Sequence, residues 1–339
     1  MLEFLEVKPD TVLFSQVVLL TLLVMFDRMK SDAQMFQVNS LMLLMFTLGL
    51  YWLDRRPWLA GSALGFALNI KGQSLVMLPY LLIRRRWSAA AAMVGAALGF
   101  ALLPGAVIGW NANLRNLGRL LGGLQTLAGT QAPEQSSTHL VDVTARLSVS
   151  VTSGVARILM QVGFGRWLWL VVGVLATAAL GYAFWAYRRA GIPVWRWPER
   201  RQQDQAPWRS VVALEWSCLI LATLVFNPQT NTRHFLLALL PVAMAATVLR
   251  KPIPRNARIM MLVGIAALFA GLTLPPGNRQ IAWLYELKQA WFFIGGPCWL
   301  ILLALGLFLW AGLQVASTLT NTASGARTVP VGVRPGEDS

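Results

Sequence analysis

A few polar residues stand within or beside long apolar runs, where they are candidates for chemistry. Lys71 interrupts one apolar stretch, and Arg233 and His234 stand where another begins. A cation in a low-dielectric setting attracts phosphate strongly, and an imidazole supplies acid, base or phosphate-binding functions. Gln37 and Asn39 precede a third run, where their amides can bind the hydroxyl groups of a sugar. Because polar groups at membrane depth are costly, these five residues form the candidate site.

Each candidate also has a purely structural interpretation. A lysine such as Lys71 can extend its amine toward the interface and only stabilise a break in a helix. His234 can serve loop carbonyls, and Asn39 can cap the helix that follows it. Glu215 stands near the start of its apolar run and is interpreted as an ordinary interfacial carboxylate. These alternatives stay open at the level of the sequence.

The remaining polar residues make no catalytic triad or metal motif. His139 and Asp142 share a segment with Ser136 and Ser137, but the chain has only 2 histidines. No zinc-ligand spacing, Walker loop or dinucleotide fingerprint is present. We therefore predict no metal site and no bound cofactor, and the need for a divalent ion is left open.

The elements that must position the candidates are membrane-spanning helices. Of the 339 residues, 56% are hydrophobic and 13% are charged, which exceeds the apolar content that a soluble core needs. The net charge of +15 comes from arginine clusters between apolar runs, so nucleic acid is not an expected partner. We predict an all-α, polytopic transmembrane helix bundle with about eight spans plus a broken, re-entrant hairpin at 59–83. The expected spans are 11–26, 39–53, 88–110, 167–187, 210–226, 235–249, 258–274 and 291–316.

The placement of arginine orients this bundle. Arg55 and Arg56 precede the hairpin, and three arginines at 84–86 follow it. Because basic flanks stay in the cytoplasm, both ends of the hairpin lie inside, and two half-length helices carry Lys71 toward the outer leaflet. A single straight span would break this rule.

The same orientation assigns sides to the connecting segments. The arginine-rich and proline-rich segments 188–209 and 250–258 are cytoplasmic. The outer segments are 27–34, 111–165, 227–233 and 275–280. We expect interfacial helices within 111–165, and a disordered tail at 317–339 after a membrane domain at 1–316. The prediction is a multi-pass protein of the plasma (inner) membrane with its candidate site on the extracytoplasmic face.

Two stretches resemble glycosyltransferase family 87, whose members are membrane enzymes that use polyprenyl-phosphate sugars. They are MFQVNSLMLLM with WLAGSALGFALNIKGQSLVMLPYLLIRRRW, and LEWSCLILATLVFNPQTNTRHFLLALLP, within about residues 35–245. In the first stretch, Gln37 and Asn39 match the positions that open a span, and Ala60 and Gly61 match the start of the hairpin. Lys71 matches the lysine within the hairpin, and the residues from Arg84 to Trp87 match its basic end. In the second stretch the matching positions are His234 and Pro241.

Three features depart from the pattern of the family. The sequence KGQS stands where the family has a lysine followed by a proline, and ARLS at 145–148 replaces an NQSL-like element. Several helices precede the glutamine element in the family, but one precedes Gln37 here, so we expect the N-terminal helices and the acid of the first outer loop to be lacking. By this resemblance Asp27 and Asp32 lie in a later loop, and we do not assign the catalytic base to them.

The resemblance implies a bundle of the GT-C type that transfers a hexose, often mannose, from a polyprenyl-phosphate donor to a lipid or glycan acceptor on the extracytoplasmic side. Lys71, His234 and Arg233 would serve the departing phosphate, and Gln37 and Asn39 would orient the sugar or the adjoining helix. Two alternatives stay open. One is a non-catalytic partial homologue, and the other is a lipid or solute transporter whose broken helix forms a site near the midplane.

Overall fold

The computed structural model describes residues 12–34, 38–127, 142–145, 147–192, 194, 206–249, 253–273 and 281–325. Within these ranges every regular element is a helix and no strand occurs, which confirms the all-α prediction. The elements in chain order are α1 (Val12–Gln34), α2 (Asn39–Trp52), α3 (Pro57–Ile70), η1 (Gly72–Val76), α4 (Met77–Ile83), α5 (Trp87–Leu102), α6 (Gly105–Ile108), α7 (Trp110–Leu127), α8 (Val151–Gln161), η3 (Gly165–Trp167), α9 (Leu168–Arg189), α11 (Ala206–Phe226), η4 (Thr232–Ala238), α12 (Leu239–Leu249), α13 (Arg255–Thr273), α14 (Ala282–Phe293) and α15 (Gly296–Gly325).

Among the described residues, 6 helical stretches are long and apolar enough to cross a membrane. They are Trp87–Ile108, Gly165–Arg189, Arg209–Phe226, Thr232–Leu249, Arg255–Thr273 and Gly296–Ser317. Each corresponds to a span expected from the sequence. The other two expected spans fall on α1 and on α2, a shorter apolar helix of 14 residues. The chain is therefore a helical, multi-pass membrane protein.

The first group of helices, α2 to α5, contains the break expected at Lys71. Helix α3 ends at Ile70, Lys71 is extended, and the chain returns through η1 and α4. Asn69 of α3 donates to the carbonyl oxygen of Ala97 of α5 at 3.0 Å, and Gly61 packs on Ala89 with the same offset of 28 positions, so α3 and α5 run parallel. The segment between them must therefore run back, which agrees with a hairpin.

Small residues allow α3 and α5 to approach closely. A β-carbon at Gly61 would lie 2.1 Å from the carbonyl oxygen of Ala89, and one at Gly65 would lie 2.4 Å from that of Met93. Interfaces of this kind are common between membrane helices, because lipid provides no hydrophobic force and close backbone contact takes its place. An ion pair between Asp54 and Arg86 joins the two basic flanks at one end of the hairpin.

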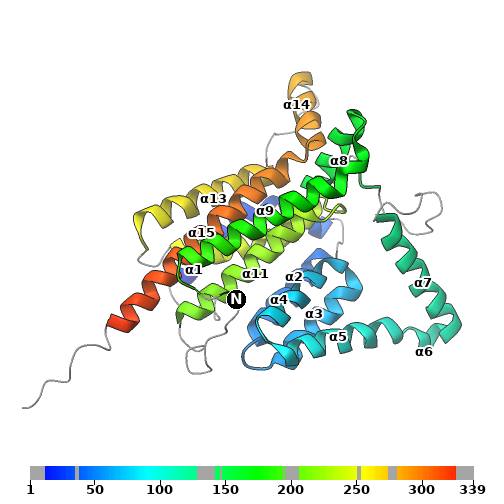
Figure 1. Ribbon diagram of the computed structural model, residues 1–339, viewed down its shortest axis with the longest axis horizontal. Helices are drawn as coiled ribbons and strands as arrows, with labels where there is room; N and C mark the ends of the chain where they lie inside the picture. The colour runs from blue at the N-terminus through cyan, green and yellow to red at the C-terminus, as the bar shows by residue number, and fades with distance from the viewer. Residues whose placement is uncertain are drawn as a thin grey trace, which may run out of the picture.

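The second group consists of α9, α11, α12, α13 and α15, which run side by side in Figure 1. Helices α13 and α15 pack closely, with Phe308 against Gly264. Leu214 of α11 lies against Gly312 of α15 in the same way. Helix α1 packs on α12 and η4, and α2 also contacts η4, so η4 is one place where the two groups meet.

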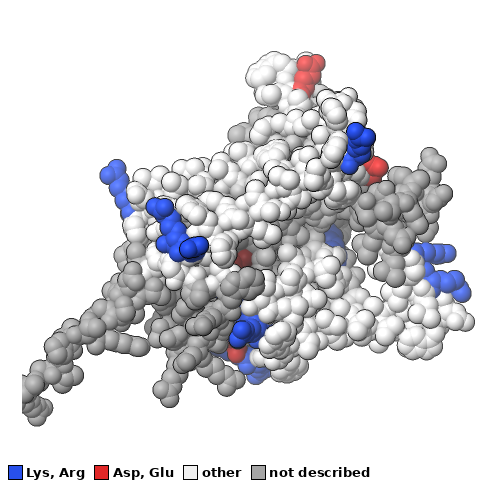
Figure 2. Space-filling view, in the orientation of Figure 1, with Lys and Arg blue, Asp and Glu red and all other residues white. Residues whose placement is uncertain are grey.

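The outer surface of the bundle is largely apolar. Helix α9 exposes Leu170, Val174, Leu180 and Phe184 along its length, and α5 exposes Leu98 and similar residues. Figure 2 shows a broad uncharged area, with the charged side chains gathered toward the edges of the molecule. A bilayer is the solvent that such a surface requires.

Three expected boundaries differ in the structure. The segment 27–34, expected as an outer loop, is the last part of α1, since it contains no proline or glycine to end the helix. The expected span 291–316 is divided, because Gly295 with φ of 72° separates α14 from α15. Helix α15 then continues to Gly325, past the point at which the disordered tail was expected to begin.

The described part of the long segment 111–165 contains two α-helices, as expected, and the second is shorter than the stretch 142–160 that favours it in the sequence. Helix α7 follows α6 away from the bundle in Figure 1 and exposes Trp110, Leu114 and Leu120, as an interfacial helix would. The second helix begins only at Val151, where the hydroxyl of Ser150 accepts from the backbone N–H of Ser153 at 3.0 Å. The preceding residues 142–145 and 147–150 are not helical.

Candidate functional site

Four helical elements bring a set of polar residues together where α1, α2, η4 and the break after α3 meet. We call this set the Lys71 cluster, and its members are Asp32, Asn39, Ser40, Lys71, Arg233 and His234. Its centre is the fully buried carboxamide of Asn39, at the start of α2. The amide oxygen accepts from Lys71 Nζ at 2.5 Å, and the amide nitrogen donates to Asp32 Oδ1 at 2.8 Å and to the backbone oxygen of Arg233 at 3.2 Å.

These contacts decide between the interpretations of Asn39. The structure shows no capping bond from a side chain at the start of α2, where Val38 is the N-cap residue. Asn39 instead bridges a cation and an anion, with its own side chain held by three groups. Gln37, the other amide expected here, lies outside the described residues.

Asp32 is the member of the cluster that sequence reasoning set aside. Its side chain is 2% exposed, and its second oxygen, Oδ2, accepts from Ser40 Oγ at 2.5 Å. Because 27–34 is helical rather than a loop, Asp32 falls on the buried face of α1 with Val17, Thr21 and Met25. These four positions are separated by 4 or 7 residues, the spacing of one helix face, and this pattern in the sequence could have predicted that Asp32 is buried.

His234 is held in one orientation by the turn that starts η4. Asn231 is extended and accepts through its side chain from the backbone N–H of Arg233 at 3.0 Å, and His234 Nδ1 accepts from the backbone N–H of Asn231 at 3.2 Å. Since Nδ1 is an acceptor, the proton of the neutral ring is on Nε2, which is then a hydrogen-bond donor. The ring is buried, and the charges of Lys71 and Asp32 both act on it.

Lys71 joins the cluster through its side chain, whereas Arg233 joins it through its backbone. Lys71 is half-buried and uses one of its three donor positions on Asn39, so the ammonium group can make further bonds. Arg233 binds Asn39 through its backbone oxygen, while its side chain is exposed. The structure thus brings together four of the five residues expected at the site: Asn39, Lys71, Arg233 and His234.

The segment 142–153 supports the loop before η4. The backbone oxygen of Thr230 accepts from the backbone N–H of Val149 at 2.8 Å and from Ser148 Oγ at 3.1 Å. Ser153 Oγ donates to the backbone oxygen of Pro228 at 3.1 Å. Ser148, the last residue of the departure ARLS, therefore supports the loop that precedes Arg233.

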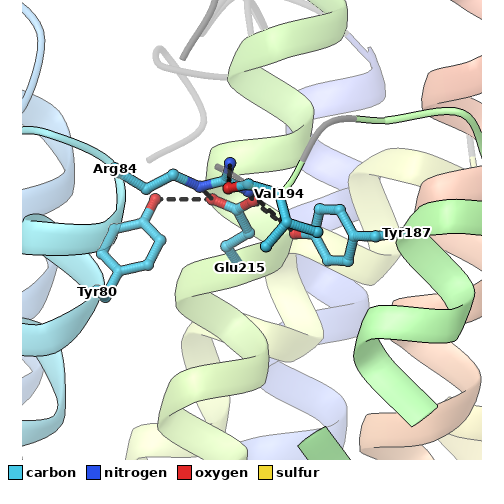
Figure 3. Close-up of polar contacts among 5 residues, drawn as sticks. All are labelled: Tyr80, Arg84, Tyr187, Val194 and Glu215. Carbon is cyan, nitrogen blue, oxygen red and sulfur yellow. Dashed lines mark hydrogen bonds and ion pairs between the residues drawn. The ribbon is translucent and has the colours of Figure 1, made fainter. Parts of the chain in front are cut away.

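A second polar cluster lies around Glu215, near the middle of α11 (Figure 3). Tyr80 and Tyr187 donate to its two carboxylate oxygens at 2.8 and 2.5 Å, and Arg84 forms an ion pair with it. Arg84 also donates to the backbone oxygen of Val194 at 2.7 Å. Glu215 is 6% exposed, so the interpretation as an ordinary interfacial carboxylate is wrong. Every charged atom here has a partner within the protein, which is typical of a structural joint.

Metal ligation finds no support among the described residues. They contain no group of three or more histidine, cysteine, aspartate or glutamate side chains placed to hold an ion. Asp142 is exposed and accepts from the backbone N–H of Thr144 at 2.6 Å, and His139 lies outside the described residues.

Comparison with known proteins gives the family. A family model described as glycosyltransferase family 87 matches residues 6–220. The chain belongs to glycosyltransferase family 87. This family and the apolar helices together make it a membrane glycosyltransferase. The match contains the Asp32, Asn39 and Lys71 positions, and Arg233 and His234 follow it.

Two further comparisons find nothing that matches. No curated protein matches the chain, and no solved structure matches it. The roles of individual residues in this family 87 member therefore have to be argued from its own geometry.

Proposed function

We propose that this protein transfers a hexose, mannose in the first instance, from a polyprenyl-phosphate donor to a lipid or glycan acceptor on the extracytoplasmic face of the plasma (inner) membrane. The observation that carries the proposal is the Lys71 cluster, in which a buried carboxylate and a cation share one bridging amide. Glycosyl transfer needs both of these groups within one site, the first for the acceptor and the second for the leaving group.

The chemistry assigns a role to each side chain. Asp32 accepts the proton of the acceptor hydroxyl as the hydroxyl oxygen forms a bond to the anomeric carbon. The bond between that carbon and the phosphate oxygen breaks, and the electron pair leaves with the polyprenyl phosphate. Lys71, the Nε2–H of His234 and the guanidinium of Arg233 stabilise the negative charge of this phosphate. Attack opposite the leaving group inverts the anomeric configuration.

The hydrogen bonds leave capacity for these steps. Both oxygens of Asp32 accept one hydrogen bond, and a carboxylate has about four acceptor positions. Asn39 separates Asp32 from Lys71, so the two charges do not form a direct ion pair that a substrate would have to break. Arginine placement supports the extracytoplasmic side, since the basic flanks of the hairpin meet at the end opposite to Lys71.

The test compares two lysines at the same end of the molecule. Lys71→Ala should lower kcat for transfer from a short-chain polyprenyl-phosphate mannose by about 10²- to 10³-fold, the usual effect of losing a charge-stabilising donor. Lys30→Ala, at an exposed position of α1, should leave the rate unchanged. An unchanged rate in Lys71→Ala would remove Lys71 from the mechanism. A wild-type protein that transfers no sugar from mannosyl, glucosyl or galactosyl donors would overturn the proposal.

The side of the membrane needs a separate measurement. A reporter fused after residue 139 should be active only in the extracytoplasmic compartment, and one fused after residue 200 only in the cytoplasm. The reverse pattern would move the site to the cytoplasmic face.

A further inference from the structure

One buried amide near the Lys71 cluster has no partner. Gln73 lies in η1, two residues after Lys71, and its side chain is 6% exposed. Neither its Oε1 nor its Nε2 makes a hydrogen bond with the rest of the described chain. A buried amide without partners is costly and uncommon in native proteins, so it indicates a partner from outside the folded chain.

The residues next to Gln73 in the chain differ from it in their contacts. Ser74, its neighbour on the same turn, donates to the backbone oxygen of Leu64 at 3.1 Å and is therefore satisfied within the protein. Gly72, which stands between Lys71 and Gln73, is exposed, and a β-carbon added to it would meet no atom within 4 Å. The Cα atoms of Lys71 and Gln73 are at most about 7 Å apart, because two residues cannot span more.

The side chains of Lys71 and Gln73 suit two different chemical groups of a ligand. The ammonium group of Lys71 suits an anion such as a phosphate. A carboxamide is neutral, and it offers two donors and an acceptor at once. Adjacent hydroxyl groups of a sugar ring also donate and accept at once, so they can satisfy both ends of the amide.

We propose that Gln73 is a specificity-determining residue that binds hydroxyl groups of the donor hexose while Lys71 holds the adjoining phosphate. This proposal rests on the proposed function and adds the residue that distinguishes a sugar-bearing donor from the bare polyprenyl phosphate. Lys71 then provides affinity for both molecules, and Gln73 provides affinity only for the one that carries a sugar.

The experiment measures thermal stabilisation of the purified protein by two probes, a short-chain polyprenyl phosphate and the same lipid phosphate carrying the hexose that the wild type transfers fastest. A ligand that binds only the folded state raises the thermal midpoint in proportion to its binding free energy. In the wild type the sugar-bearing probe should give the larger rise. Gln73→Met, which keeps the side-chain volume, should give equal rises with the two probes, and Lys71→Ala should give a small rise with either.

Further measurements separate recognition from a structural role. Without ligand, Gln73→Met should be at least as stable as the wild type, since it removes an unsatisfied amide. Ser74→Ala, one position away, should lower the unliganded thermal midpoint and keep the difference between the probes. In transfer assays, the preference of the wild type for the natural donor over its deoxy-hexose analogues should fall by about 10-fold or more in Gln73→Met.

The outcomes distinguish this proposal from the one it rests on. If neither probe stabilises the wild type, the proposed donor is wrong. If the wild type distinguishes the two probes and Gln73→Met distinguishes them equally well, the partner of Gln73 is water or another group, and the role in sugar recognition is overturned.

Discussion

At the scale of single residues, the bridging amide of Asn39 keeps a buried carboxylate and a half-buried cation from forming a direct ion pair. A direct ion pair would neutralise both groups and occupy their hydrogen-bonding positions. Here Asn39 satisfies one donor of Lys71 and one acceptor position of Asp32, and Ser40 satisfies another. The proposed mechanism assigns the remaining positions to the substrate.

The role of Asp32 as a base predicts the effect of one isosteric change. Asp32→Asn keeps the size of the side chain but lowers its basicity, so kcat should fall by about 10²- to 10⁴-fold, the usual contribution of a general base. Asp142→Asn, at an exposed turn, should transfer sugar at the wild-type rate. Transfer assays on both variants, with donor binding measured in parallel, check this expectation. Equal rates in Asp32→Asn and wild type would exclude Asp32 as the base.

The orientation of His234 predicts that its two nitrogens have separable functions. In His234→Asn the amide oxygen can replace Nδ1 as acceptor for the backbone N–H of Asn231, but nothing replaces the donor at Nε2. The thermal midpoint should therefore stay near that of the wild type, while kcat falls by about 10-fold or more. Loss of stability with an unchanged rate in the remaining folded protein would make His234 only a cap of η4.

At the scale of elements, the position of Lys71 depends on how closely α3 packs on α5. The chain can leave α3 at Lys71 and return through η1 only because α3 lies against the backbone of α5 at Gly61 and Gly65. The hydrogen bond from Asn69 to the carbonyl oxygen of Ala97 fixes the last turn of α3 before the break.

This packing predicts opposite effects for two glycine substitutions. Gly61→Ala places a methyl group against the carbonyl oxygen of Ala89 and should lower stability by about 1–3 kcal/mol, as overpacking does. Gly99→Ala, on α5 with open space around it, should be neutral or stabilising, since alanine favours the helix. Thermal midpoints in detergent measure both changes. A neutral Gly61→Ala would show that α3 and α5 are further apart.

At the scale of the whole molecule, two polar clusters join the two groups of helices, one near the middle of α11 and one beyond its C-terminal end. The Lys71 cluster connects α2 and the end of α3 to η4, and the Glu215 cluster connects α4 to α9 and α11. About 17 Å of helix, from Glu215 to Phe226, separates the Glu215 cluster from the loop before η4. The Glu215 cluster is internally satisfied, whereas Gln73 near the Lys71 cluster is not, so the two clusters differ in their capacity for a ligand.

The Glu215 cluster predicts that removing one of its two charges lowers the stability of the protein more than removing both. Glu215→Leu leaves the buried guanidinium of Arg84 without its anion and should destabilise the protein by about 3–5 kcal/mol. The double change Arg84→Met with Glu215→Met should recover much of this loss. Chemical or thermal unfolding in detergent measures the cycle. A double variant no more stable than Glu215→Leu would mean that the tyrosine contacts, rather than the ion pair, join the helices.

Much of the architecture follows from composition and arginine placement. Apolar runs of spanning length determine the helices, because a bilayer requires backbone hydrogen bonds to be satisfied within each segment. Paired basic flanks around 59–83 determine the return of the chain at Lys71, and the structure confirms this break. Lys71, Asn39, Arg233 and His234 were identified because each is polar beside an apolar run, which is a local property.

The partners of these residues were decided by the tertiary structure. The sequence pattern predicts a loop at Asp32, but the helical continuation of α1 places it on the buried face. The pattern predicts an interfacial Glu215, but α4 and α9 enclose it. Which side chain reaches which depends on contacts between helices far apart in the chain, such as Asn39 with Arg233, and a single sequence does not encode those distances locally. The missing partner of Gln73 is likewise visible only when everything that surrounds it is in place.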